Sequence, residues 1–154
     1  MAIEIKRNIE ERKRLDELAE ENGITKFVDY LPPEIILIEP PTPDKDCEEY
    51  ALGTVGIRNY LPYLFQEIDK PQEGDIVLYK NPGEGIVHIG RYQKDGSVIS
   101  KWNTDGPVLK HPLDLVPLSY GTTVIFQRIP ESKLEMLRKP DAPFYIMDAM
   151  DNLI

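Results

Sequence analysis

The fold is set by residues 86–102, which read IVHIGRYQKDGSVISKW. Two runs rich in β-branched and aromatic residues, 86–92 and 97–102, are separated by a short segment that contains Asp95-Gly96. Asp-Gly between two such runs is typical of a tight β-hairpin. The stretch therefore predicts two antiparallel strands, the first carrying His88 and the second carrying Ser100.

Two further strand-like runs flank this hairpin, IVLY at 76–79 and TTVIFQR at 122–128. Turn-forming segments bound them, NPG at 81–83 and YG at 120–121. We therefore expect four strands in an antiparallel meander. Between the last two strands, within residues 109–117, we expect one helical turn.

The first part of the chain has a helical pattern. Residues 3–22 are dense in charged side chains, and their apolar residues recur at near-helical spacing: Ile5, Ile9, Leu15, Leu18 and Ala19. Asn22-Gly23 is a suitable C-terminal stop. We expect an amphipathic helix with a charged outer face. It is either a solvated helix packed on the domain or a helix that binds a protein partner or a second copy.

A proline-rich stretch, residues 31–46, leads to a second predicted helix at about 47–59, which Asp44 or Asp46 could cap. The run at 35–38 is interpreted as an edge strand or an extended buried segment. Residues 131–138 predict a short helix followed by a loop. Helices before a small antiparallel sheet indicate the α+β class.

The length of 154 residues fits one domain. Within it we distinguish an N-terminal helical extension (1–30), a core (31–130) and a C-terminal helix and tail (131–154). No apolar run approaches the ~20 residues that a membrane-spanning helix needs. The N-terminus lacks the pattern of a signal peptide, so we expect a cytoplasmic protein, with export by a signal-independent route left open.

The charge pattern excludes some partners. A net charge of −9 and a pI of about 4.7 disfavour binding to nucleic acid and to anionic membranes. Two histidines and one cysteine give no zinc-type spacing, and no calcium loop or Gly-rich phosphate loop is present. We therefore expect no metal and no cofactor.

The only cysteine, Cys47, falls at the start of the second predicted helix. A helix N-terminus and a nearby imidazolium both lower the pKa of a thiol, and free amides at the helix start can hold an oxyanion. His88 is the candidate base. The alternative from the residues alone is a small buried cysteine and a structural histidine.

Three motifs support the chemical interpretation. DCEEYA (46–51), QEGDIVLY (72–79) and HIGRY followed by GSVIS (88–92 and 96–100) occur in this order. Together, over residues 43–103, they resemble the cysteine helix, the Gly-Asp strand and the histidine hairpin of NlpC-type and CHAP-type cysteine peptidases and amidases.

The resemblance implies a permuted papain-like fold, in which N-terminal helices pack on a small antiparallel sheet. It implies Cys47 as nucleophile and His88 as general base. Ser100 matches the third position, where histidine, asparagine, glutamine or an acid is usual, and Asn103 is the alternative orienter. His111 is a competing base.

The implied activity is hydrolysis of an amide bond in a peptide, a peptidoglycan stem or a side chain, through an acyl-enzyme. An acyltransferase would use the same intermediate, and a catalytically weak interaction module is the alternative from a different class. Trp102 and Tyr50 are candidate substrate-binding residues, each with packing as its alternative. Because anionic neighbours raise the pKa of a thiol, at least one of Glu48 and Glu49 should point to solvent.

Overall fold

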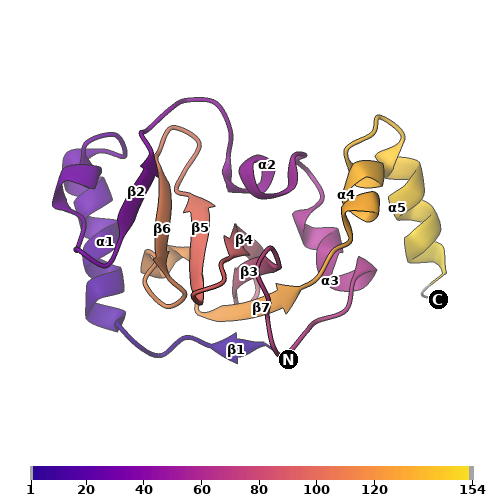
Figure 1. Ribbon diagram of the computed structural model, residues 1–154, viewed down its shortest axis with the longest axis horizontal. Helices are drawn as coiled ribbons and strands as arrows, with labels where there is room; N and C mark the ends of the chain where they lie inside the picture. The colour runs from indigo at the N-terminus through magenta and orange to yellow at the C-terminus, as the bar shows by residue number, and fades with distance from the viewer. Residues whose placement is uncertain (1, 153–154) are drawn as a thin grey trace.

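The computed structural model describes residues 2–152, and these form an antiparallel sheet with helices on both faces (Figure 1). The strand order is β1-β7-β3-β4-β5-β6-β2. The strands are β1 (Ile3–Glu4), β2 (Ile36–Glu39), β3 (Ile76–Asn81), β4 (Gly85–Tyr92), β5 (Ser97–Lys101), β6 (Val108–Pro112) and β7 (Thr123–Gln127). The helices are α1 (Ile9–Asn22), α2 (Cys47–Leu52), α3 (Leu61–Leu64), α4 (Glu131–Leu137) and α5 (Ala142–Asp151), with single 3-10 turns η1 (Phe27–Tyr30), η2 (Arg58–Tyr60) and η3 (Leu118–Tyr120).

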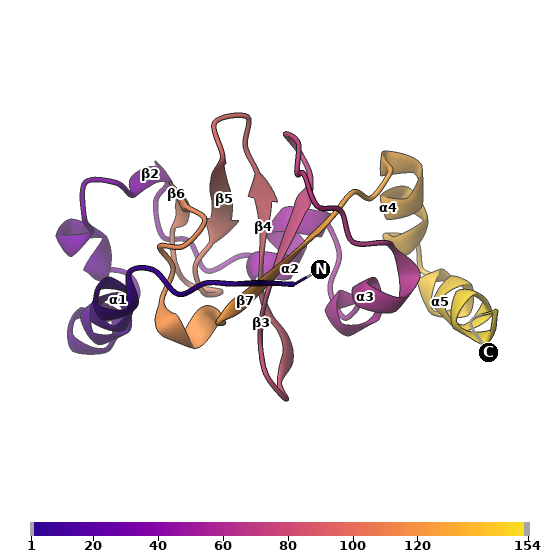
Figure 2. The same cartoon turned by 90° about the horizontal axis from the view of Figure 1, so that it is seen from below.

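The interior strand β3 shows how the sheet separates two hydrophobic layers. Side chains of a strand alternate between its faces. Val77 and Tyr79 lie in one cluster, with apolar residues of α1, whereas Ile76 and Leu78 lie in a second cluster, with apolar residues of α2 to α5. Figures 1 and 2 show α1 at one end of the molecule and α4 and α5 at the other. The expected α+β class is confirmed.

The four predicted strands are confirmed as β3, β4, β5 and β7. The predicted meander order is wrong for the last of them, because β7 pairs with β3 and β6 takes the place beside β5. The predicted hairpin joins β4 to β5, and Gly96 adopts a φ of 87°, which glycine tolerates without steric cost. The C-terminal helix at 131–138 is confirmed as α4. Asp46, one of the two proposed caps, accepts a hydrogen bond from the Glu49 amide at 2.8 Å and starts α2.

The helical turn predicted within 109–117 is wrong. Residues 108–112 form β6, which pairs with β5 on one side and β2 on the other. These two strands provide hydrogen-bond partners for the backbone N–H and C=O groups of β6, which a helical turn would otherwise have to pair locally. The nearby helical turn, η3, follows at Leu118–Tyr120. The run at 35–38 contributes to an edge strand, β2.

Three boundaries also differ from the predictions. The first helix begins at Ile9, because Ile3–Glu4 pair with β7 as β1. The second ends at Leu52, where Gly53 takes a left-handed conformation with a φ of 80°. The segment after α4, expected to be a loop, forms α5.

Strands β4 and β5 pair over a short length, through Arg91 with Ile99 and Tyr92 with Val98. Their approach is close at Gly90, where a Cβ would lie 2.5 Å from Cγ1 of Val98. Helix α2 packs against both strands. This arrangement brings the start of α2 beside the part of β4 that carries His88. Within residues 2–152, no helix is long and apolar enough to cross a bilayer.

Candidate functional site

A small pocket of about 290 Å³ lies at the N-terminus of α2. Its lining comes from several segments and comprises Asp46, Cys47, Arg58, Val87, His88, Asn103, Thr104 and Tyr120. The structure thus brings together three predicted site residues, Cys47, His88 and Asn103, which are far apart in the sequence. Ser100, Trp102 and Tyr50 do not line this pocket.

Cys47 is the first residue of α2 and is 7% exposed. Burial raises the pKa of its thiol. The positive charge of Arg58 and the backbone N–H of Ile89 lower that pKa, and the carboxylates of Asp46 and Glu48 raise it. The net direction is upward, which corrects the expectation that a helix terminus and an imidazolium would lower it. The resting thiol is therefore protonated at neutral pH.

His88 is 2% exposed and contacts two aromatic rings. Its ring stacks on Tyr120 with centroids 4.3 Å apart and is tilted against Tyr79 at 5.5 Å. Burial lowers the pKa of His88 well below its ordinary value, and the charges of His111 and Arg58 lower it further. Among residues 2–152, no group offers a hydrogen bond to its buried Nε2. His88 is thus a neutral imidazole with an unsatisfied ring nitrogen.

Glu48 is buried beside the thiol rather than turned to solvent. Its Oε2 accepts hydrogen bonds from the amides of Ile57 at 2.8 Å and Arg58 at 3.2 Å, and its Oε1 lies 2.7 Å from Nε of Arg58. Glu49 is half-buried. The negative charge next to Cys47 is therefore paired with a guanidinium, which the sequence argument had not anticipated.

Ser100 is buried between two other side chains. Its Oγ lies 2.8 Å from Nε2 of His111 and accepts a hydrogen bond from Nε1 of Trp102 at 3.1 Å. Nδ1 of His111 lies 2.8 Å from the Pro112 carbonyl oxygen, which can only accept, so Nδ1 carries the proton. The Ser100 hydroxyl must then donate to Nε2 of His111. Because its only hydroxyl proton is used in this hydrogen bond, Ser100 cannot donate a hydrogen bond that would orient His88.

Asn103 lies at the pocket in a left-handed conformation with a φ of 73°. Its Oδ1 accepts a hydrogen bond from the Thr104 amide at 2.8 Å. This local bond fixes the side chain of Asn103 at the rim shared with Cys47 and His88. Of the two proposed orienters, Asn103 and not Ser100 lines the pocket.

The two candidate substrate-binding residues have other contacts. Trp102 is fully buried in the core and stacks with Phe27 at 6.1 Å, so it does not line an open groove. The Tyr50 hydroxyl donates to Oε2 of Glu39 at 2.8 Å and ties α2 to β2. Burial and this carboxylate raise the pKa of Tyr50 to about 12. His111, the competing base, is buried against Trp102 outside the pocket lining.

Two buried cations hold the loops around the site. Nζ of Lys101 donates to the carbonyl oxygens of Thr42 at 2.8 Å, Thr104 at 2.9 Å and Gly106 at 2.8 Å. It thereby joins the segment before Cys47 to the segment that carries Asn103. On the other face, Nε of Arg12 donates to the Val116 carbonyl oxygen at 2.9 Å, in the segment that leads to Tyr120.

Sequence reasoning missed Arg58, Arg12 and Tyr120 as parts of the site. Arg58 follows a glycine-containing turn and has no sequence pattern that separates it from a surface arginine. Arg12 belongs to a helix rich in charged residues, where burial of a single arginine has no local signal. Tyr120 stood next to a predicted turn glycine. Each side chain acquires its role from contacts with segments distant in sequence.

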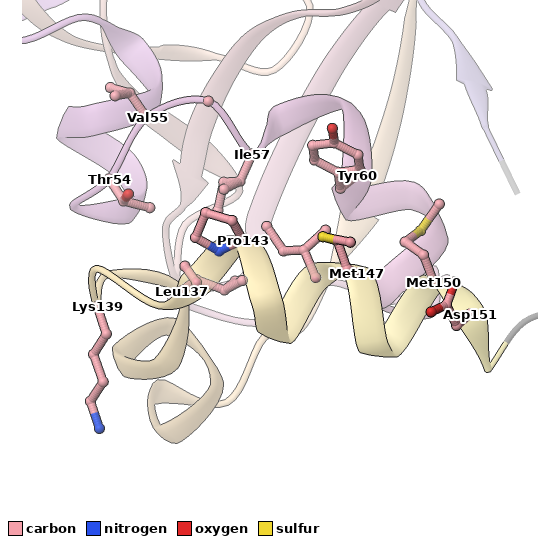
Figure 3. Close-up of a pocket in the computed structure, with 13 residues that line it drawn as sticks. Thr54, Val55, Ile57, Tyr60, Leu137, Lys139, Pro143, Met147, Met150 and Asp151 are labelled. Carbon is pink, nitrogen blue, oxygen red and sulfur yellow. The ribbon is translucent and has the colours of Figure 1, made fainter.

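A larger pocket of about 680 Å³ lies away from the cysteine, between α5 and the segment that joins α2 to η2. Its lining is mostly apolar. Figure 3 shows Pro143 and Met147 of α5 facing Ile57 and Tyr60. Within the described chain, no cluster of three His, Cys, Asp or Glu side chains is placed to hold a metal ion.

Comparisons of the chain with models of protein families, with curated proteins and with solved structures found no match.

Proposed function

We propose that this protein is a thiol hydrolase that cleaves an amide bond, with Cys47 as nucleophile and His88 as general base. The observation that carries the proposal is the pocket lined by both residues. Its support is a buried neutral imidazole and a free thiol that line one pocket; Nε2 of the imidazole has no hydrogen-bond partner among residues 2–152, Sγ of Cys47 included. A neutral histidine is the protonation state that a general base requires.

The reaction begins from an uncharged pair. As Sγ of Cys47 attacks the carbonyl carbon, the thiol proton moves to His88 and an S–C bond forms. In this proposal the backbone N–H groups of Cys47 and Glu48, in the first turn of α2, stabilise the oxyanion, whereas the N–H of Glu49 is bonded to Asp46. His88 then gives its proton to the departing nitrogen as the C–N bond breaks. Water, deprotonated by His88, releases the acid and restores the thiol.

The fold proposed with this activity is papain-like. Its support is the packing of the cysteine-bearing helix α2 against an antiparallel sheet, with the histidine on β4 and the next polar positions on β5. The substrate class proposed is a peptide or side-chain amide. Asn103, at the pocket, takes the orienting role in this proposal in place of Ser100.

The activity is tested by trapping the acyl-enzyme. Wild-type protein is mixed with an activated p-nitrophenyl ester, and the adduct on the Cys47 peptide is followed by mass spectrometry. We expect acylation of the wild type, none of C47A, and at least tenfold slower acylation of H88Q. C47S and the exposed-site variant S132A serve as controls. Circular dichroism shows whether H88Q is folded.

Equal acylation rates in folded H88Q and wild type would overturn the role of His88. Lack of any adduct on Cys47 would favour the second candidate function, an interaction module without catalysis. That candidate is favoured by one observation, the upward direction of the Cys47 pKa, which leaves little thiolate at neutral pH. Hydrolase and acyltransferase are then separated by adding an amine acceptor and analysing the products.

A further inference from the structure

Arg58 reaches back from η2 to the N-terminus of α2. Its Nε lies 2.7 Å from Oε1 of Glu48, and its Nη2 lies 3.5 Å from Oδ2 of Asp46 and 3.9 Å from Sγ of Cys47. The side chain of Arg58 is about one-quarter exposed, and that of Glu48 is almost fully buried. The guanidinium is therefore fixed by a buried carboxylate and lies next to the only thiol.

We propose that Arg58 is a catalytic residue of the proposed thiol hydrolase, and that its guanidinium stabilises the Cys47 thiolate as the proton leaves for His88. The inference rests on the proposed function and adds a permanently charged third group to its two neutral ones. An arginine remains charged at every pH at which the protein is folded. It therefore supplies the positive charge that neutral His88 lacks before proton transfer.

The charged and titratable groups around Sγ determine whether this cation can act. Asp46 and Glu48 on α2 are negative, whereas Arg58 on η2 is positive. His88 on β4 and Tyr120 in η3 line the same pocket and are neutral at rest. Coulomb interactions at about 4 Å are strong where water is excluded, because the effective dielectric constant is low. Arg58 is the only cation that lines the pocket in the described chain.

Glu48 holds the guanidinium in position. Its carboxylate accepts three hydrogen bonds, from the Ile57 amide, the Arg58 amide and the Arg58 side chain. Both the backbone and the side chain of Arg58 are thereby tied to α2. The direction of the pKa effect agrees with the geometry, since the Arg58 charge opposes the rise in the Cys47 pKa that burial causes.

The test measures the rate of Cys47 alkylation by iodoacetamide from pH 6 upward. R58Q alone leaves Glu48 as an unpaired buried carboxylate, which would raise the thiol pKa by itself. The informative comparison is therefore E48Q with the double variant E48Q/R58Q, in which that carboxylate is absent from both. We expect the thiol pKa to rise by about one unit on loss of Arg58, so alkylation below the pKa slows about tenfold.

R138Q is the matched control, because Nε of Arg138 donates to the Leu52 carbonyl oxygen at 2.8 Å, at the opposite end of the same helix. R138Q should leave the alkylation profile unchanged. R58K keeps the charge without the planar fork and should lie between wild type and R58Q. Because R58K leaves no unpaired charge, it tests the proposal even where the double variant fails to fold.

Two outcomes would overturn the role of Arg58: identical profiles for E48Q and E48Q/R58Q, or identical profiles for wild type, R58K and R58Q. Alkylation needs neither an amide substrate nor His88. An Arg58-dependent profile in a protein that forms no acyl-enzyme would therefore refute the hydrolase and not the electrostatic effect. Normal acylation with no dependence on Arg58 would refute the role of Arg58 and leave the hydrolase.

Discussion

Ser100 Oγ lies 2.8 Å from Nε2 of His111, on the neighbouring strand. The Pro112 carbonyl fixes the proton on Nδ1 of His111, so Ser100 donates to this histidine while accepting from Trp102. Every polar atom of this buried group has a partner. Ser100, which the sequence suggested as an orienter of His88, therefore belongs to a structural network between β5 and β6.

The first prediction concerns S100A. The substitution leaves Nε2 of His111 and Nε1 of Trp102 unpaired in the core, and should lower the free energy of unfolding by about 2 kcal/mol. Urea unfolding measures this loss, with S132A on the exposed surface of α4 as the control. Acylation of Cys47 in folded S100A should equal that of the wild type. A large loss of acylation with unchanged stability would instead make Ser100 an orienter of His88.

The second prediction concerns pH. Burial lowers the pKa of His111 from 6.5 to about 4, and burial also lowers the pKa of His88 well below its ordinary value. The unfolded chain therefore binds protons that the folded protein does not, and stability falls as pH drops below about 6.5. His111 alone should cost about 2 kcal/mol between pH 7 and pH 5, from 1.36 kcal/mol per pKa unit.

Urea unfolding of wild type and H111Q at both pH values checks this effect. H111Q should be less stable at pH 7, because it disrupts the Ser100 network, but its stability should change less between pH 7 and pH 5. H88Q should show a similarly reduced dependence. Parallel losses in wild type and both variants would assign the acid sensitivity to other groups.

The third prediction concerns the close approach of β4 and β5. A Cβ at Gly90 would lie 2.5 Å from Cγ1 of Val98 and 3.1 Å from the Ile99 carbonyl oxygen. G90A should destabilise the protein by about 1–3 kcal/mol through overpacking. In a V98A background, G90A should cost less, because the closest atom has been removed. Additive effects in this double-mutant cycle would show that the two positions do not clash.

The fourth prediction concerns Lys101, whose ammonium joins the carbonyls of Thr42, Thr104 and Gly106. K101M keeps most of the apolar stem and removes all three hydrogen bonds. We expect a loss of about 2 kcal/mol or more in stability and faster proteolysis within residues 40–46. K94M, at the exposed hairpin, should change neither measurement. Unchanged cleavage of K101M would show that Lys101 does not hold the segment before Cys47.

The sequence predicted those features that depend on neighbouring residues. Strand periodicity located β3, β4, β5 and β7, and Asp95-Gly96 located the hairpin between β4 and β5. Asp46 could be named as a helix cap because capping is a contact within one helical turn. These predictions need only local backbone geometry, which a few consecutive residues specify.

Predictions failed where pairing with distant segments overrode local preference. Residues 108–112 became a strand because β5 and β2 supply ladder partners on both sides. Ile3–Glu4 lie outside the first helix because they pair with β7 as an antiparallel strand. The residues of each segment do not by themselves specify which strand they pair with.

The sequence by itself determined the α+β class, the strand that carries His88 and the helix that starts at Cys47. Only the tertiary structure decided which polar groups surround them: Arg58 beside the thiol, His111 on Ser100, and an unsatisfied Nε2 on His88. The physical reason is that burial and electrostatic pairing are set by atoms that meet across the fold. The type of a residue determines which hydrogen bonds and ion pairs its side chain can form. The packing of segments distant in sequence determines which of these interactions it forms in the folded protein.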